Sequence, residues 1–501
     1  MTPPTAATAQ QTLTLRFFLA LAGYFLLHIL LRVTISDSLD YDEAEQALLG
    51  QWLLAGYTEQ PPLYTWIQHG LFVLFGKSAF AISLMKNGLL FLTYASVYLA
   101  ACHILGDRRS AILAASSLLF IPQIGWESQR DMTHTTLVVF AASASLWQVM
   151  RLVKNDSLLN YCILGLFLGT GFMAKANFAL FVTVVAIALC SFAEGRTILF
   201  TRRIAATFAV LAIFTATYLL WMTGNQDIVF SATHKFKRGV EHYWLRGTVS
   251  LVVNSFLFLT PLWLICGLIF PSGYTGSGFQ SSDFQRRFIG RYLLFLFIAL
   301  LLVVLLFKVT YVKDRWLQPL LFVVPIYFFT RLSPAEITPR KFRMYLATVL
   351  IVAAAVYAAF TLRVVGASYT NNYCRLNYPF QAFADDMQRS GFTEGLIISD
   401  DRFLAGNFHF RFPASTAIVP DYRLETLVES GRYSSVAVIW QVAESIPIPA
   451  DLETFLLETY GFRAADYPIH YFEHPYLYAD SDVVTLAMMF IPRPPVLAST
   501  R

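Results

Sequence analysis

Charged residues are scarce in this chain of 501 residues, where Asp, Glu, Lys and Arg together make up 14%. Hydrophobic residues make up 56%, and the mean hydropathy is +0.54. A set of soluble domains of this length would need more charge for its surface, so the composition argues against that organisation. The sequence instead predicts a polytopic α-helical membrane protein.

Cysteine is also rare, with five residues scattered along the chain. Four of them lie in apolar runs, and their spacing matches neither a disulfide framework nor a metal-binding motif. We expect them to be buried as small hydrophobic side chains. Internal repeats of fixed period and low-complexity tracts are absent as well.

Long apolar runs make up much of the sequence. A helix needs about 20 mainly apolar residues to cross about 30 Å of hydrocarbon, and about eleven segments approach that length. The predicted spans are residues 14–34, 80–105, 110–124, 133–152, 157–173, 176–193, 203–223, 248–271, 288–308, 316–332 and 343–362.

The connections between these spans differ in charge. With a cytoplasmic N-terminus, fourteen Lys and Arg residues lie in or beside inside connections and nine lie outside. This bias agrees with the positive-inside rule, and eleven crossings then place the tail outside the membrane. The predicted domains are a transmembrane domain, residues 1–362, with the outer loops, and a domain outside the membrane, residues 363–501.

The predicted tail changes in composition and has no apolar run of span length. Short apolar runs at residues 395–399, 415–420 and 434–440 alternate with candidate helices such as residues 451–460. This alternation favours a small α/β domain. The tail contains no Gly-rich phosphate loop.

Residues 34–62 hold six acidic residues and no Lys or Arg, directly after the first span. Four of the acids fall in "DYDEAEQ", Asp40–Gln46. The predicted topology places them outside the membrane. They could form an ordinary solvated loop, or they could be carboxylates held at the membrane surface for chemistry.

Later outer connections carry further ionisable residues. Asp131 lies at the mouth of the fourth predicted span, where an ionisable group is costly unless it faces a cavity. Lys175 lies between two apolar runs, and Lys313 and Arg315 lie in a late outer connection. Each has a structural explanation by itself, such as snorkelling of Lys175. Together they place carboxylates and cations on one surface.

Both signs of charge suit one class of reaction. A carboxylate can accept the proton of an attacking hydroxyl, while Lys and Arg bind a phosphate and stabilise it as a leaving group. A sugar attached to a lipid phosphate is a substrate that would use these groups.

The chain carries in order "DEAEQ", "EQPPLYTW", an Asp at the fourth span, "GLFLGTGFMAKANFAL" (165–180) and, in the tail, "ISDDRFLAGNFHFRFP" (398–413). The order of the first four resembles the GT-C membrane glycosyltransferases, and most of all the bacterial branch related to protein O-mannosyltransferases and the aminoarabinose transferase of lipid A, over about residues 15–330. The tail is similar to those of rhizobial-type lipid A and core galacturonosyltransferases. The resemblance implies an inner-membrane protein with catalytic outer loops and a periplasmic tail.

This resemblance implies an inverting enzyme that moves a sugar from a polyprenyl phosphate to an envelope acceptor, with lipid A or lipopolysaccharide core first. It makes Asp42 the catalytic base or its electrostatic aid, Glu43 its support and Asp131 the acid of the second loop. Asp40 and Glu45 are expected to be solvated or to lie at a helix end.

The resemblance also implies the substrate-binding residues. Lys175 is expected near the lipid phosphate. The aminoarabinose enzymes have Lys directly before the two prolines, whereas this chain has Gln60, which puts in question a phosphate contact there and an identical donor. The other residues with expected binding roles are Glu59, Lys313, Arg315 and Trp316, together with Lys235, Lys237 and Arg238 of a basic outer loop.

Several alternatives stay open from the sequence. The basic loop could attract an anionic substrate or grip headgroups. Mg²⁺ or Mn²⁺ could bridge the phosphate and the carboxylates of Asp42, Glu43 and Asp131, since such ions prefer oxygen ligands. A flippase of lipid-linked sugars or an O-antigen-type ligase or polymerase could share the location, although transporters place their charges nearer mid-membrane. The expected partners are the lipid-linked donor, an envelope acceptor and membrane lipids, with no nucleic acid.

Overall fold

The computed structural model describes residues 6–231, 241–275, 283–420, 424–428, 432–442, 448–479 and 481–492. The chain folds into two compact units. Unit 1 comprises Met1–Leu27, Thr58–Tyr64 and Lys86–Val356, and unit 2 comprises His28–Tyr57, Thr65–Met85 and Tyr357–Arg501. Unit 2 therefore groups residues 34–57, the acidic segment, with the tail, whereas residues 58–62 belong to unit 1. The domain limits predicted above, residues 1–362 and 363–501, stay a prediction.

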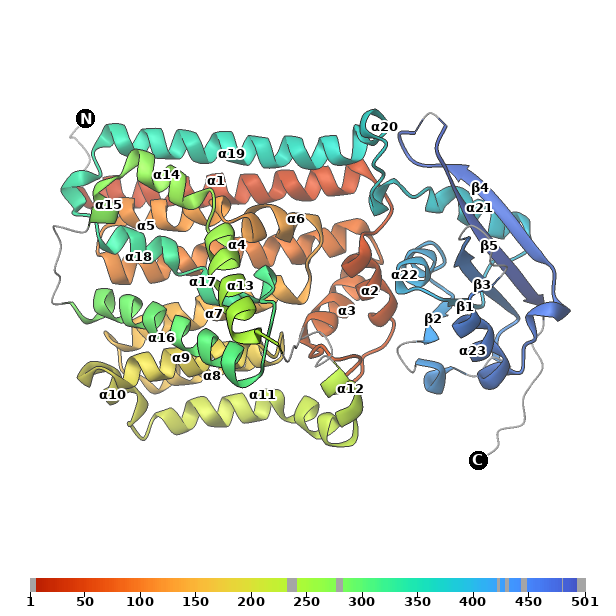
Figure 1. The fold of residues 1–501 in the computed structure, drawn as a ribbon, viewed down its shortest axis with the longest axis horizontal. Coiled ribbons are helices and arrows are strands. Elements are labelled where there is room, and N and C mark those ends of the chain that lie inside the picture. The colour runs from red at the N-terminus through yellow and green to blue at the C-terminus, as the bar shows by residue number, and fades with distance from the viewer. Residues whose placement is uncertain are drawn as a thin grey trace. The chain divides into compact units, whose positions relative to one another are not determined.

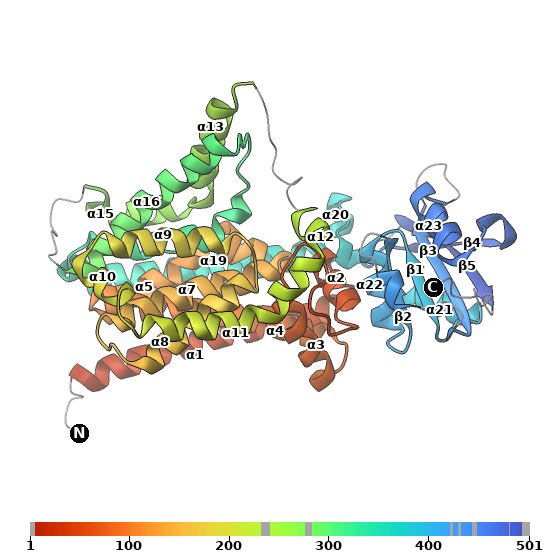
Figure 2. The ribbon, with the colours of Figure 1, turned by 90° about the horizontal axis from the view of Figure 1, so that it is seen from below.

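Unit 1 consists of helices that run alongside one another (Figures 1 and 2). Helices α1 and α4 contribute to both units, as does α19. The helices are α1 (Ala6–Ile35), α4 (Ala79–Leu105), α5 (Arg108–Ser116), η1 (Ser117–Phe120), η2 (Gln123–Glu127), α6 (Ser128–Arg130), α7 (His134–Leu152), α8 (Leu158–Phe172), α9 (Phe178–Cys190), α10 (Ala193–Leu199), α11 (Ile204–Gly224), α12 (Gln226–Phe230), α13 (Tyr243–Phe258), α14 (Leu262–Ile269), α15 (Ser272–Thr275), α16 (Phe284–Leu306), η4 (Asp314–Trp316), α17 (Gln318–Leu321), α18 (Val324–Thr330), η5 (Pro334–Glu336) and α19 (Pro339–Val365).

Within the described residues, six helices are long and apolar enough to cross a membrane: α1 from Gln10 onward, α4, α7, α11, α16 and α19. The pair α13 and α14, bent by 56° at a short break, makes a seventh if it is one span. The apolar helices α3 (Leu63–Phe75), α8 and α9, and the stretch Gln318–Thr330, are shorter than a full span. Six or seven of the expected spans are therefore full-length helices within the described residues, and the count of eleven crossings stays a prediction.

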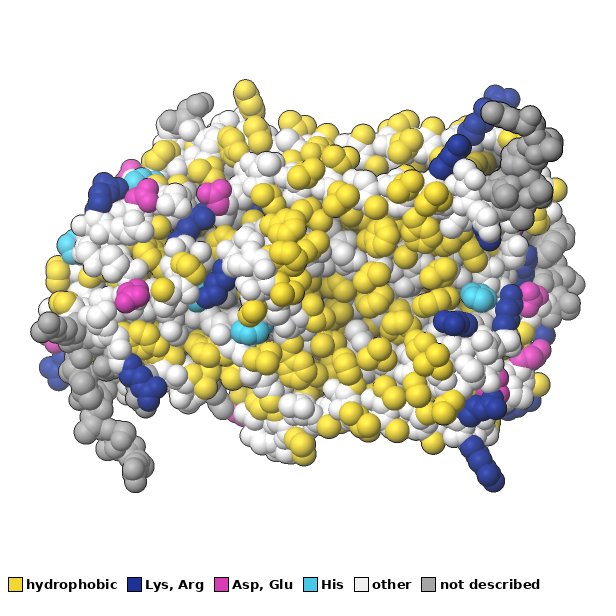
Figure 3. Space-filling model, turned by 180° about the vertical axis from the view of Figure 1, so that it is seen from behind, with side chains coloured by type: hydrophobic (Ala, Val, Ile, Leu, Met, Phe, Trp, Pro, Cys, Tyr) yellow, Lys and Arg dark blue, Asp and Glu magenta, His cyan; other side chains and the backbone are white. Residues whose placement is uncertain are grey.

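Exposed hydrophobic side chains cover much of the helix surface. Figure 3 shows them over the middle of one face, with Lys and Arg gathered toward the ends of the helices. Leu268, Ile213 and Leu306 are each more than 70% exposed. Apolar side chains are stable in such positions when lipid tails surround them, and a helix satisfies its own backbone hydrogen bonds there.

Unit 2 contains the acidic segment and a five-stranded sheet. Its elements, beyond its parts of α1, α4 and α19, are α2 (Tyr41–Leu49), most of α3, α20 (Ala367–Thr370), η6 (Arg375–Asn377), α21 (Phe380–Arg389), β1 (Leu396–Ser399), α22 (Arg402–Arg411), β2 (Thr416–Ile418), η8 (Leu424–Leu427), β3 (Ser435–Gln441), α23 (Ala450–Tyr460), η10 (Ala464–Asp466), β4 (Ile469–Pro475) and β5 (Val483–Pro492).

The strand order is β2-β1-β3-β5-β4. The first three strands are parallel, with Ile397 of β1 opposite Ala417 of β2 and Ala437 of β3. Strand β5 pairs antiparallel with β3, with Val438 opposite Met489, and β4 pairs antiparallel with β5. The buried strands β1 and β3 are continuous apolar runs, as parallel strands covered on both faces require.

The sequence predicted part of this sheet. The runs at 395–399, 415–420 and 434–440 form β1, β2 and β3, and residues 451–460 lie in α23. The prediction lacked β4 and β5. Strand β4 is the edge strand "IHYFEHP", whose polar and partly exposed side chains make no apolar run.

Helix α22 of the tail packs directly against α2 of the acidic segment. A Cβ atom at Gly406 would clash with the backbone carbonyl of Ala44, so only glycine permits this approach. Next to it, the Asn407 amide accepts from the Leu39 N–H at 2.8 Å and donates to the Leu39 carbonyl at 3.3 Å. The tail thus holds both backbone groups of a residue just before α2.

We therefore expect Gly406→Ala to force the two helices apart and to destabilise the protein by about 1–3 kcal/mol, as overpacking does. Thermal unfolding of the detergent-solubilised protein measures this. Gly70→Ala in α3 is the matched control, because a Cβ there meets no atom within 4 Å. Equal melting temperatures for the two variants would contradict the close packing.

Candidate active site

The acidic motif forms the first turn of a capped helix. Asp40 is the N-cap of α2, with extended backbone angles, and its side chain accepts hydrogen bonds from the following turn. Glu43 completes the capping box by accepting from the Asp40 N–H at 3.1 Å. Asp42 lies in this turn and is partly exposed. Acids are favoured here because the helix dipole is positive at its N-terminus.

Arginines hold three of the four acids. Glu43 pairs with Arg32 at 2.7 Å, and both side chains are at most 5% exposed. Asp40 lies 3.4 Å from Arg375, and Glu45 lies 2.6 Å from Arg402. Burying a carboxylate without a counter-ion costs free energy, so these arginines stabilise the buried acids at the start of α2.

Arg32 also orders the chain that leads into α2. Its guanidinium donates to the carbonyl of Ser36 at 2.8 Å and to that of Ser38 at 2.7 Å. The Ser36 and Ser38 hydroxyls donate in turn to backbone carbonyls of the tail, at Leu376 and Tyr378, each at 2.6 Å. The turn before Asp42 is therefore fixed from both sides.

Tyr41, which precedes Asp42, lies between two guanidinium groups. Arg375 lies 4.6 Å and Arg402 lies 4.4 Å from its ring centroid, both in cation–π range. Burial raises the pKa of the Tyr41 hydroxyl, the charge of Asp401 adds to this and Arg402 opposes it. The phenol therefore stays protonated and neutral at physiological pH.

These contacts refine the expectations for the motif. Glu43 supports the motif through Arg32 and the helix cap, while its assignment as a catalytic residue stays a prediction. Asp40 lies at a helix end as expected. For Glu45 the expectation was wrong, because Glu45 lies inside α2, is only 9% exposed and pairs with Arg402 instead of water.

Unit 1 brings together a second group of predicted residues. Lys175 donates to the Thr135 hydroxyl at 2.8 Å, and Glu59 and Lys175 both act electrostatically on buried His134. The His134 ring lies 5.3 Å from that of Tyr64. Residues from three distant parts of the sequence thus meet at the start of α7.

The late outer connection adjoins Lys175. Asn177 donates to the Trp316 carbonyl at 3.4 Å, and the Lys313 ammonium lies 5.9 Å from the centroid of the Trp316 ring. Asp314 accepts from the Gln123 amide at 2.8 Å. Arg315 is exposed. The predicted cations Lys175 and Lys313 are therefore carried on neighbouring segments.

Asp131 lies between α6 and α7 and is partly exposed. Its N–H donates to the Glu127 carbonyl at 3.0 Å, and the Glu127 carboxylate binds Arg130 at 2.5 Å. The three predicted cations Lys235, Lys237 and Arg238 lie outside the described residues.

No group of three His, Cys, Asp or Glu side chains able to hold a metal ion occurs among the described residues. Both carboxylate oxygens of Glu43 accept from Arg32, so Glu43 does not fit the role of a metal ligand. A divalent cation at Asp42 or Asp131 stays a prediction.

The sequence interpretation missed the arginines that surround α2. Arg402 and Asn407 lie within "ISDDRFLAGNFHFRFP", which was noted only for its resemblance. The sequence did indicate a partner for Arg32, because an arginine inside an apolar span is costly in free energy without one. Arg363, which lies 3.9 Å from Asp40, and Arg375 follow the last predicted span and carried no sequence feature beyond their charge.

Relatives of this chain identify its class. Residues 59–221 match the family described as dolichyl-phosphate-mannose-protein mannosyltransferase. The chain is similar in fold to the crystal structure of ArnT from Cupriavidus metallidurans bound to undecaprenyl phosphate, with a TM-score of 0.58 at 14% identity, covering 94% of this chain and 97% of that one. At this identity the likeness shows the fold, which is that of a GT-C membrane protein.

Two further relatives are similar over most of their length. The chain is 32% identical over 481 residues to lipopolysaccharide core galacturonosyltransferase RgtB of Rhizobium johnstonii, covering 93% of this chain and 95% of that protein. It is 34% identical over 413 residues to RgtA of the same organism, covering 81% and 82%. The chain belongs to the family of these lipopolysaccharide core galacturonosyltransferases. The predicted family, fold class and enzyme class are confirmed.

The Arg32–Glu43 pair gives a test of how α2 is held. Arg32→Gln leaves a buried carboxylate without its counter-ion, so we expect a loss of about 3–5 kcal/mol in the free energy of unfolding. Denaturant unfolding in detergent measures it. Glu43→Gln in the same chain should recover part of the loss, because the uncompensated charge is then removed.

Arg203→Gln is the matched control for this substitution. Arg203 also pairs with a carboxylate, Asp156 at 2.5 Å, but both side chains are about half exposed. Such a surface pair contributes about 0–1 kcal/mol. If Arg32→Gln cost no more than Arg203→Gln, the structural role of the buried pair would be refuted.

Proposed function

We propose that this glycosyltransferase moves a galacturonosyl group from a polyprenyl phosphate to a sugar hydroxyl of lipopolysaccharide core. The observation that carries this proposal is the similarity to RgtB, which extends over 95% of that protein and so includes both the helical part and the tail. The bound undecaprenyl phosphate of the structurally similar ArnT supports the class of donor.

The chemistry assigns Asp42 the role of general base. The acceptor oxygen forms a bond to the anomeric carbon of the donor sugar, and the bond from that carbon to the phosphate oxygen breaks. The phosphate leaves with the electron pair, and the hydroxyl proton passes to the Asp42 carboxylate. A single displacement of this kind inverts the anomeric centre.

Asp42 suits this role better than its neighbours. Asp40, Glu43 and Glu45 are buried and bound to arginines, so their carboxylates hold α2 in place. Asp42 shares the rigid first turn but remains partly exposed. A base needs both a fixed position and access to the acceptor.

Lys175 is assigned to the leaving phosphate. Its ammonium is partly buried and fixed by Thr135, and a positive charge stabilises the charge that develops on the departing oxygen. Gln60 occupies the place before the two prolines where the aminoarabinose enzymes have Lys. This difference favours a donor other than aminoarabinose. Lys313 and Arg315 supply further positive charge beside Lys175.

The proposed location is the inner membrane, with a cytoplasmic N-terminus and a periplasmic tail. The excess of basic residues in the predicted inside connections supports this orientation. Transfer to lipopolysaccharide core outside the cytoplasmic membrane is consistent with it.

The decisive test is Asp42→Asn. We expect the substitution to lower transfer by at least about 100-fold, since general-base catalysis contributes about 10²–10⁴ in rate. Purified protein is supplied with polyprenyl-phosphate galacturonic acid and isolated lipopolysaccharide, and mass spectrometry follows the uronosyl addition to the core.

Asp37→Asn is the matched control, because Asp37 is an acid of the same segment that is 66% exposed and lies 3.4 Å from Arg411. We expect it to retain transfer. Unchanged turnover in Asp42→Asn would rule out the base assignment. Transfer by the wild type to lipid A instead of core would contradict the proposed acceptor. Use of a different sugar would contradict the proposed donor.

A further inference from the structure

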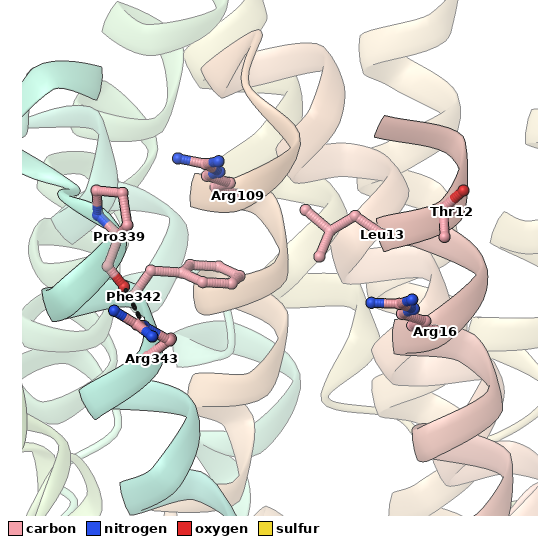
Figure 4. Close-up of a pocket in the computed structure, with 7 residues that line it drawn as sticks. All are labelled: Thr12, Leu13, Arg16, Arg109, Pro339, Phe342 and Arg343. Carbon is pink, nitrogen blue, oxygen red and sulfur yellow. Dashed lines mark hydrogen bonds between the residues drawn. The ribbon is translucent and has the colours of Figure 1, made fainter. Parts of the chain in front are cut away.

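Three arginines from three helices of unit 1 surround one pocket (Figure 4). Arg16 comes from α1, Arg109 from α5 and Arg343 from α19. The pocket has a volume of about 390 Å³, and its described lining contains no Asp or Glu. The remaining lining residues are Thr12, Leu13, Pro339 and Phe342.

Two helix starts add to the positive potential of this pocket. Helix α5 begins at Arg108 and α19 begins at Pro339, so Arg109 and Phe342 lie in first turns. The N-terminus of a helix carries a partial positive charge. The Arg343 guanidinium is oriented by a hydrogen bond to the Pro339 carbonyl at 3.3 Å. The Arg109 guanidinium lies 6.0 Å from the centroid of the Phe342 ring.

A second, apolar pocket of about 330 Å³ adjoins the first and shares Leu13, Arg16 and Phe342 with it. It follows α1 as far as Tyr24 and α19 as far as Ala353. Its other lining residues are mainly apolar side chains of α1, α4, α5 and α19. Charge is therefore confined to one end of a groove whose remainder is hydrophobic.

The length of the groove matches one leaflet of a bilayer. It extends eleven residues along α1, from Leu13 to Tyr24, and eleven along α19, from Phe342 to Ala353. At 1.5 Å per residue this is about 16 Å. Half of the roughly 30 Å hydrocarbon core is about 15 Å. The arginines then lie at headgroup depth.

We propose that this groove is a binding site for an anionic phospholipid of the surrounding bilayer. Arg16, Arg109 and Arg343 bind the headgroup phosphate, and an acyl chain lies in the apolar part of the groove. Guanidinium groups form strong, geometrically specific hydrogen bonds with phosphate. Basic pockets between membrane helices recognise anionic headgroups by this chemistry.

The site is separate from the predicted donor site. On α4, Tyr98 bonds to Thr14 of α1 at 2.8 Å, beside the arginine pocket, whereas Lys86 donates to the Gln129 carbonyl at 3.3 Å, two residues before Asp131. The two α4 residues are twelve apart, or about 18 Å along the helix. A lipid held by Arg16, Arg109 and Arg343 therefore does not present its phosphate at the end of α4 that adjoins Gln129 and Asp131.

The test compares two phospholipids with the same acyl chains, anionic phosphatidylglycerol and zwitterionic phosphatidylcholine. The delipidated full chain is titrated with each, and native mass spectrometry counts the bound lipids. We expect phosphatidylglycerol to bind at least about tenfold more tightly, because each basic residue near a headgroup contributes about 1 kcal/mol. The triple variant R16Q/R109Q/R343Q should lose this preference.

Two variants serve as controls. R16K/R109K/R343K keeps the positive charge and should retain most of the preference, since lysine binds phosphate as a point charge. Arg202→Gln removes an exposed arginine of the connection before α11, outside the pocket, and should bind as the wild type does.

Equal binding of the two lipids by the wild type would overturn the proposal, and this comparison holds even if the triple variant does not fold. An undiminished preference in a folded triple variant would also overturn it. So would displacement of phosphatidylglycerol by undecaprenyl phosphate at equal concentration, which would assign the groove to a polyprenyl lipid instead.

Discussion

The buried ion pair between Arg32 and Glu43 is the contact on which the arrangement of the acidic helix depends. Arg32 joins the end of α1 to the first turn of α2 and also binds the two carbonyls of the turn between them. The Glu43 side chain also accepts a hydrogen bond from the Asp40 N–H and so caps the helix. Because both charges are removed from water, neither can be lost alone without a large penalty. The position of Asp42 follows from this constraint, since it lies in the same turn.

Residues of the tail, which are distant in the sequence, also hold α2 in place. Gly406 and Asn407 bring α22 against α2, and Arg375 and Arg402 supply charges that residues 34–62 lack. That segment has no Lys or Arg, and its counter-ions are Arg32 of the span before it and arginines more than 330 residues later in the sequence. The α/β fold of the tail therefore holds the helix that carries the proposed base.

The sequence predicted the parts of this structure that depend on local patterns. Apolar length located the helices, and apolar runs located β1, β2 and β3, because burial of a single segment is visible in its own composition. The edge strand β4, "IHYFEHP", mixes polar and apolar side chains and was missed, and β5 was missed although "VVTLAMMFIP" is mainly apolar. The pairs that hold Asp40, Glu43 and Glu45 were also missed, since a partner such as Arg402 is chosen by the fold and not by spacing. Similarity to a family pointed to Asp42, but only the contacts separate its role from those of the neighbouring acids.

Two groups of arginines in this protein have different environments, and the difference decides what each group can do. Arg32, Arg375 and Arg402 face carboxylates of the same chain, so their charge is satisfied internally. Arg16, Arg109 and Arg343 share a pocket whose described lining has no carboxylate, beside the starts of two helices that add positive potential. Three guanidinium groups that line one pocket add positive charge of the same sign to it, and an anion from outside the chain offsets that charge. In a bilayer the most abundant such anion is a lipid phosphate, and the adjoining apolar groove accommodates the chain attached to it.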